Sequence, residues 1–259
     1  MKPKIIYPKS QIINYLANIL FFTFSILNAE TLTFSIDYLG FSVASVVMTL
    51  QDSDDIQNDI DIQKKIAVQA VSSRFTTLLK NTFDNTYTSY IDHNFRPLIY
   101  QRGIQQSNFQ EEATVEYHFD TLQASYYDSV NERSETYQIL GNTRDFFTTL
   151  YYLRTLDLQQ SHELTLDVAG KIILISTRHT GVETLRTNIG RVRTNKVEIY
   201  FTWYDDKEKM QSDILTNNLY NEDNILIFWF TNDENQIPVK SQYTRKPFPV
   251  YWSITNHTG

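Results

Sequence analysis

Alternation of apolar and polar residues is the feature that most constrains how this chain can fold. In the segment TLTFSIDY, residues 31–38, every second residue is apolar. Side chains of a β-strand point alternately to its two faces, so this spacing predicts a strand with one buried face. The same period recurs within residues 44–50, 65–128 and 197–203. The chain is therefore predicted to be mainly β.

The segment ILIFWF, residues 225–230, departs from this alternation because all six of its residues are apolar. Neighbouring residues of a strand face opposite ways, so both faces of this strand are predicted to be buried. One interpretation is a central strand with the helix on one side and the barrel interior on the other. In the alternative, one row lines an apolar cavity, and Phe228, Trp229 and Phe230 are candidate ligand-binding residues.

One segment, GNTRDFFTTLYYLRTLDL, has the periodicity of a helix. Its apolar residues recur at spacings of three and four from Phe146 to Leu156, which predicts a helix of about three to four turns with one apolar face. Asn142 or Thr143 is the expected N-terminal cap. A helix this short is stabilised mainly by packing, so it must lie on a sheet.

Asp145 and Arg154, near the two ends of this helix, are its candidate functional charges. At about 100° per residue they point to opposite sides and cannot pair with each other. In the structural interpretation, Asp145 stabilises the first helical turn and Arg154 binds a carboxylate or carbonyl at the other end. In the alternative, Arg154 lies at a cavity mouth and binds the anionic head group of a ligand.

The strands follow one another along the chain and are separated by turn sequences. Leu39-Gly40, Ala169-Gly170 and Thr180-Gly181 predict tight turns between antiparallel neighbours. The predicted architecture is a coiled antiparallel sheet, in the form of a barrel, half-barrel or β-roll, with one short helix packed on it. Residues 30–259 are predicted to form a single β-rich domain.

Residues 1–29 have the three-part pattern of a secretory signal peptide. Lys2, Lys4 and Lys9 give a positive start, an apolar run follows to Leu27, and a small residue, Ala29, precedes the expected cleavage site. The apolar run is shorter than the roughly 20 residues that a membrane-spanning helix needs. We therefore expect export to the periplasm, with an uncleaved N-terminal anchor as the alternative.

Composition argues against several functional classes. Without residues 1–29, the chain has 20 basic and 30 acidic residues, a net charge of −10. This charge argues against a nucleic-acid partner.

The chain contains no cysteine, so thiolate catalysis and thiolate metal sites are excluded. The five histidines lack the spacing of metal ligands, and the acidic segment 51–61 does not match an EF-hand loop. No nucleophile or phosphate-loop motif occurs. We expect no metal, no cofactor and no enzymatic activity.

Three stretches resemble a known family. RDFFTTLYYLR, from Arg144 to Arg154, resembles the motif D-x-L-S-x-L-Y-x-L-R, and the segment 168–199 looks like the strands that follow it. FWFTNDENQIPVK, residues 228–240, is similar to a closing W-L-S-D-D-x-x-R-I-P-V-K. The chain thus resembles the family of Domain of Unknown Function 3108, a group of exported bacterial proteins.

The resemblance implies an exported, largely antiparallel β domain with no assigned activity. Thr148 stands where the family has serine, Phe146 where proline is common, and Gln236 where arginine is common. The closing hairpin is also similar to that of periplasmic lipoprotein carriers, which are half-barrels with an apolar interior.

Three functions remain open from the sequence. The first is a non-enzymatic periplasmic module that binds a lipid, another apolar or amphiphilic ligand, or an envelope protein. The second is a structural or assembly partner of envelope proteins, with a core filled by side chains. The third, a hydrolase of envelope polymers, requires two close carboxylates that the sequence does not reveal.

Overall fold

The fold is described from a computed structural model of the chain. The structure describes residues 29–53, 56–57, 60–74, 76, 82–206, 213, 215–216, 222–244 and 247–259. The predicted signal segment lies outside these ranges except for Ala29. Export and signal cleavage therefore stay predictions.

The described chain forms one sheet of 15 strands and one short two-stranded ribbon. All neighbouring strands of the large sheet are antiparallel except the last pair, β11 and β12, which are parallel. This confirms the predicted fold class. The strands of the sheet are β1 Glu30–Tyr38, β2 Phe41–Asp52, β5 Lys64–Ser72, β6 Asp84–Ile91, β7 Pro97–Gln106, β8 Phe109–His118, β9 Gln123–Asp128, β10 Arg133–Gln138, β11 Thr143–Arg144, β12 Glu163–Val168, β13 Lys171–Thr187, β14 Gly190–Trp203, β15 Ile225–Thr231, β16 Pro238–Tyr243 and β17 Val250–Thr258. The ribbon consists of β3 Ile56–Gln57 and β4 Ile60–Asp61.

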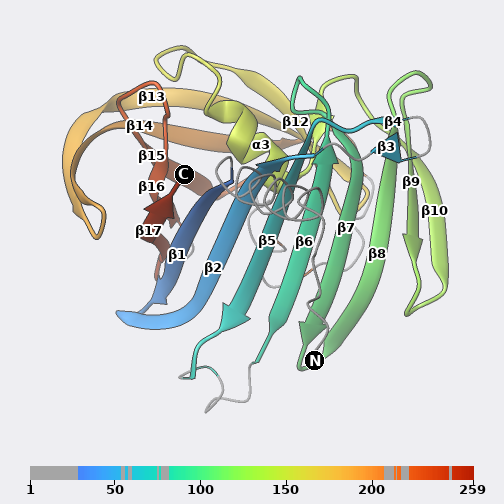
Figure 1. The fold of residues 1–259 in the computed structure, drawn as a ribbon, viewed down its shortest axis with the longest axis horizontal. Helices are drawn as coiled ribbons and strands as arrows, with labels where there is room; N and C mark the ends of the chain where they lie inside the picture. Colours follow the sequence, from blue (N-terminus) through green and yellow to red (C-terminus); the bar gives the residue numbers. More distant parts are fainter. Residues whose placement is uncertain are drawn as a thin grey trace, which may run out of the picture.

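The sheet consists of two meanders joined at its centre. From one edge to the other the order is β10-β9-β8-β7-β6-β5-β2-β1, followed by β17-β16-β15-β14-β13-β12-β11. The two meanders are joined by the pairing of β1 with β17 (Figure 1). The two edges are β10 and β11, which are consecutive in the chain.

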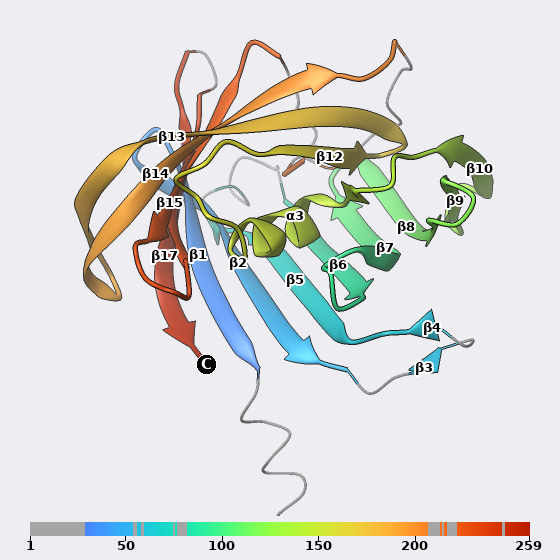
Figure 2. The same cartoon turned by 90° about the horizontal axis from the view of Figure 1, so that it is seen from above.

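The sheet curls around α3, the helix Phe146–Leu153. Seen from above, α3 lies inside the curve, between β12 on one side and the strands β5 and β6 on the other (Figure 2). The helix therefore occupies the concave side, where the inward rows of both meanders meet. This placement explains why one hydrophobic cluster contains residues from both halves of the chain.

Local structure follows the predicted patterns at most positions. In β1 the buried residues alternate along the strand, and Leu39 and Gly40 turn the chain with positive φ angles of 55° and 80°. The turn predicted at Thr180-Gly181 is wrong. Gly181 has φ 147° and lies at a bulge within the continuous strand β13. A bulge uses the conformational freedom of glycine without reversing the chain.

The helix is shorter than its apolar stripe. It has eight residues, about two turns rather than three to four. Its N-cap is Asp145, whose carboxylate accepts the backbone N–H of Thr148 at 2.9 Å. The expected caps are used elsewhere, because Asn142 accepts a hydrogen bond from Thr165 and Thr143 pairs with β12.

Candidate functional site

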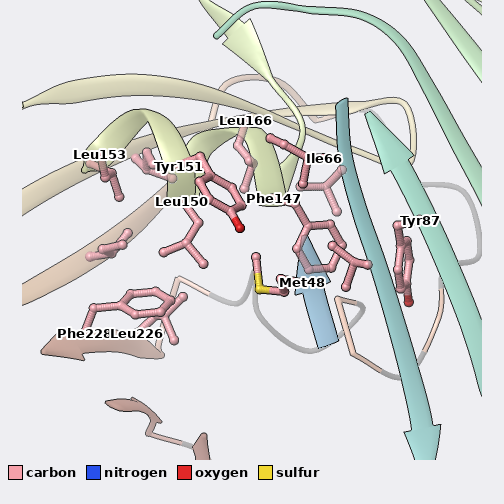
Figure 3. Close-up of a cluster of buried hydrophobic side chains, with 14 of the residues drawn as sticks. Met48, Ile66, Tyr87, Phe147, Leu150, Tyr151, Leu153, Leu166, Leu226 and Phe228 are labelled. Carbon is pink, nitrogen blue, oxygen red and sulfur yellow. The ribbon is translucent and has the colours of Figure 1, made fainter. Parts of the chain in front are cut away.

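Phe228 belongs to the row of β15 that faces the helix. Together with Leu226 it lies opposite α3, with Leu150 and Leu153 across the gap (Figure 3). The cavity left between them has a volume of about 10 Å³, which is at the lower limit for a single water molecule. Phe230 is fully buried and its ring centroid lies 5.5 Å from that of Phe228. The inner row of β15 is therefore packed core.

Trp229 lies on the opposite face of β15 and is covered by charged side chains. Its indole N–H donates to Glu183 at 2.5 Å. Lys196 and Lys240, its neighbours on the two adjacent strands, place their ammonium groups 5.5 and 4.8 Å from the ring centroid. Long lysine stems shield apolar surface while their charged ends stay in water. Trp229 is consequently only 5% exposed.

Both faces of β15 are buried, as the sequence predicted. The interpretation that the helix covers one face and the barrel interior covers the other was wrong. The helix lies inside the curved sheet, so helix and interior cover the same face. The second face is closed by the lysines and Glu183. Phe228 and Trp229 therefore point to opposite sides and line no common cavity within the described structure. That these residues bind a ligand stays a prediction.

Arg154 is fully engaged by the protein. Its guanidinium forms a bidentate ion pair with Glu30, at 2.5 and 2.7 Å, and donates to the carbonyl oxygen of Asn235 at 3.1 Å. Bidentate pairs of this kind fix geometry as well as charge. Arg154 thus ties the end of α3 to β1 and to the β15–β16 turn. The structural interpretation of Arg154 matches this geometry.

The inward row of β7 and β8 contains a buried ion pair. Arg102 and Glu111 meet at 2.8 Å, with side chains 4% and 2% exposed. The hydroxyl of Tyr126 donates to the same Glu111 oxygen, Oε1, at 2.8 Å. Burial raises the pKa of the Glu111 carboxyl, and attraction to Arg102 opposes this shift. Such a pair requires a structural or functional explanation, because removing two charges from water is costly.

An open cleft lies beside this pair. It has a volume of about 470 Å³ and is lined by residues of the β7–β8 turn, 106–111, and of the β9–β10 turn, 126–133. Figure 1 shows both turns at one end of the sheet, with α3 toward the other end. Glu111 and Tyr126 form part of its lining. Most of its lining residues are polar, whereas small-molecule sites are usually lined mainly by apolar and aromatic side chains.

This cleft was not predicted from the sequence, although a signal was present. Along β8 the inward positions are Phe109, Glu111, Ala113, Val115 and Tyr117. A charged residue within an otherwise apolar row is expected only where a partner is buried with it. Arg102 interrupts the inward row of β7 in the same way. Two opposite charges in the inward rows of one hairpin predict a buried pair.

Asp167 closes the seam between the two edges of the sheet. No backbone ladder joins β10 to β11 or β12 among the described strands. Instead the hydroxyls of Tyr117 and Tyr137 donate to Oδ2 of Asp167 at 2.9 and 2.5 Å. Oδ1 accepts the backbone N–H of Gly170 at 3.0 Å. Burial raises the pKa of Asp167 despite these donors.

Three buried carboxyls are expected to make the fold more stable in mild acid. Burial raises the pKa of Asp145, Asp167 and Glu111, so each binds its proton more tightly in the folded than in the unfolded chain. Their stabilising effect is complete below the ordinary value of about 4 and is lost as pH rises through the raised values. We expect the free energy of unfolding to increase from pH 7 to pH 5. Urea titrations should show a smaller increase for Asp167→Asn than for the exposed control Asp120→Asn. Equal increases in both variants would contradict the assignment.

Residues 33–247 match the family model described as a protein of unknown function, DUF3108. The chain belongs to the DUF3108 family. No curated protein sequence matches it.

Solved structures extend this assignment at the level of the fold. A β-barrel-like protein of the domain of unknown function DUF1849 from Brucella abortus aligns with a TM-score of 0.58 at 11% identity, covering 89% of this chain and 97% of that one. A candidate lipoprotein from Parabacteroides distasonis aligns with a TM-score of 0.34 at 11% identity, over 89% and 95% of the chains. A protein with a YmcC-like fold from Bacteroides fragilis gives 0.34 at 9% identity, over 90% and 96%. The first likeness shows a shared β-barrel-like fold.

The first DUF3108 motif builds the start of α3. The Asp145 carboxylate accepts hydrogen bonds from the backbone N–H and the hydroxyl of Thr148, and from Ser89 of β6 at 3.0 Å. Thr148 keeps the hydroxyl that the family serine supplies. Phe146 is the first helical residue, a position at which proline is favoured. The departures at both positions are therefore compatible with the fold.

The closing DUF3108 motif meets the end of the same helix. The side-chain amide of Gln236 donates to the carbonyl oxygens of Arg154 and Leu156 at 2.6 and 2.8 Å. These carbonyls follow the helix and have no intrahelical partner. Gln236 thus caps the helix without an ion pair. This contact satisfies carbonyls just beyond the end of α3, where the apolar stripe still continues to Leu156.

Within the described ranges, no cluster of three or more histidine, aspartate or glutamate side chains is arranged to hold a metal ion. No helix within those ranges combines the length and the apolar character needed to cross a bilayer.

Proposed function

We propose that this DUF3108 domain is an exported, non-enzymatic protein of the bacterial envelope that acts through its surface. Its role is that of a binding or assembly partner rather than a carrier enclosing an apolar molecule. The supporting observation is the filled space between α3 and β15, where about 10 Å³ is left beside Phe228. An acyl chain needs far more room than a cavity of one water.

The fixed position of α3 supports the same proposal. Asp145 joins the start of the helix to β6, and Arg154 joins its end to β1. Gln236 adds two hydrogen bonds from the β15–β16 turn. Opening an apolar cavity beside Phe228 would require the helix to leave these contacts together. The N-terminal segment 1–29 supports export.

Native mass spectrometry of protein from the exported fraction, with lipid analysis of a solvent extract, tests the absence of an enclosed ligand. We expect the mass of the polypeptide alone. A recurrent apolar molecule that is lost in Phe228→Ala and kept in Phe41→Ala would overturn the proposal in favour of a carrier. Phe41 is a matched control because it is 54% exposed.

Export is tested separately by cell fractionation of the full chain with a C-terminal epitope. We expect the protein in the periplasmic or envelope fraction, with a mass that corresponds to cleavage after Ala29. Recovery of the uncleaved chain in the cytoplasmic fraction would refute export.

A further inference from the structure

The hairpin of β13 and β14 projects beyond the rest of the sheet as an arm, residues 182–193. The ladder of β12 ends at Ser176 of β13, and the ladder of β15 ends at Thr194 of β14. The arm therefore lies outside the ladders of both neighbouring strands, and Figure 1 shows it extending from the side of the sheet. Such a projection can contact another surface without the rest of the sheet.

One face of the arm carries three arginines. Arg186 lies directly opposite Arg191, and Thr184 lies opposite Arg193. Because side chains alternate along a strand, Arg186, Arg191 and Arg193 share one face, and all three are exposed. The arm contains one acidic residue, so this face concentrates positive charge in a chain whose residues 30–259 have a net charge of −10.

These arginines lack a counter-charge within the protein. Among the described residues, none of the three guanidinium groups forms an ion pair or a hydrogen bond. The acidic residue of the arm, Glu183, lies on the opposite face, where it accepts the indole N–H of Trp229. Like charges directly opposite each other on adjacent strands destabilise a hairpin. The pairing of Arg186 with Arg191 therefore favours a partner that supplies negative charge.

The position of the arm favours a membrane surface as this partner. The apolar run of the predicted export signal ends just before β1. Seen from above, the start of β1 and the tip of the arm both lie below α3 in the view (Figure 2). A chain held at a bilayer through residues 1–29 would therefore present the arm to the same bilayer.

The chemistry of the arginines suits lipid phosphates. Guanidinium groups pair bidentately with phosphate, and each arginine close to an anionic leaflet adds to the attraction. The negative charge of the remaining chain would keep its other faces away from such a leaflet. We propose that Arg186, Arg191 and Arg193 dock the domain on an anionic lipid surface.

The inference rests on the proposed envelope function and adds the surface to which the domain binds. Co-sedimentation of the purified chain with vesicles tests it independently of export. Vesicles of phosphatidylcholine alone, compared with vesicles containing about 30% phosphatidylglycerol, separate attraction to charge from binding through the apolar N-terminal segment. We expect stronger binding to the anionic vesicles, and we expect this excess to fall steeply between about 0.05 M and about 0.5 M NaCl.

Matched variants locate the contact. Arg186→Gln, Arg191→Gln and Arg193→Gln should each weaken binding to anionic vesicles about fivefold, and the triple variant about a hundredfold. Arg178→Gln removes the same charge from the same hairpin. Arg178 is already paired with Glu198 at 2.7 Å on the other face, so this variant should change binding by less than about twofold. All the replaced side chains are exposed, so the variants should fold.

Three results would overturn the proposal. The first is equal binding to neutral and anionic vesicles. The second is an anionic excess that Arg178→Gln weakens as much as Arg186→Gln does. The third is displacement of the chain from the vesicles, at matched ionic strength, by a decaglutamate peptide or by inorganic phosphate, which would identify an acidic protein segment or a free anion as the partner. Anionic binding by a chain that stays in the cytoplasm would support the docking surface and refute export alone.

Discussion

Replacing Arg102 with methionine is expected to lower the free energy of unfolding by about 3–5 kcal/mol, because it leaves the buried Glu111 carboxylate without its cation. The two side chains are 4% and 2% exposed, so water cannot take over the role of the guanidinium. The loss should be measured by urea denaturation at pH 7.

The control is Arg133→Met. Arg133 pairs with Glu135 at the surface, with a side chain 50% exposed, and its loss should cost less than about 1 kcal/mol. The double variant Arg102→Met/Glu111→Gln should recover most of the stability, because a neutral amide still accepts from Tyr126. Equal losses of unfolding free energy in Arg102→Met and Arg133→Met would show that the buried pair contributes no more to stability than the surface pair.

Replacing Phe147 with alanine should cost a similar amount, about 3–5 kcal/mol, through the cavity it leaves. Phe147 is 1% exposed, and its ring lies 4.9 Å from that of Tyr87 and 5.3 Å from that of Phe146. Figure 3 shows it at the contact of α3 with Ile66 and Tyr87. The measurement is thermal and urea unfolding.

Phe41→Ala serves as the comparison here too, because Phe41 is 54% exposed and its truncation should change stability by less than about 0.5 kcal/mol. If Phe147→Ala lowered the free energy of unfolding no more than Phe41→Ala does, α3 would not be the centre of the core. The inner face of the sheet would then be stabilised mainly by strand-to-strand contacts.

The local pattern of the sequence was sufficient to predict the strands and the existence of the helix. The alternation of apolar and polar residues follows from the geometry of a single strand. Accordingly, buried residues alternate along β1 and along much of β14 in the structure. The unbroken apolar run of β15 correctly indicated two buried faces. It could not reveal that lysine stems close the outer face of Trp229, because those lysines come from β14 and β16.

Features that depend on distant partners were beyond the sequence analysis. The stripe through Leu156 predicted a longer helix, whereas Gln236, which caps the carbonyls beyond its end, lies some 80 residues later in the chain. The cleft requires the β7–β8 and β9–β10 turns to be side by side, which strand order alone decides. Arg102 and Glu111 were visible as charges in apolar rows, but their pairing depends on the register of the hairpin.

The pairing of β1 with β17 has a consequence for the order in which the chain folds. Within each meander, every strand pairs with a neighbour that is close in sequence. All of these pairs are antiparallel except β11 and β12, so both halves can form largely through local contacts. Among the described strands, the β1–β17 ladder alone joins segments more than 200 residues apart. Contacts over long separations slow folding because loop closure must precede them. The rate-limiting step should therefore be the docking of two preformed half-sheets, in which α3 and the seam at Asp167 become ordered together.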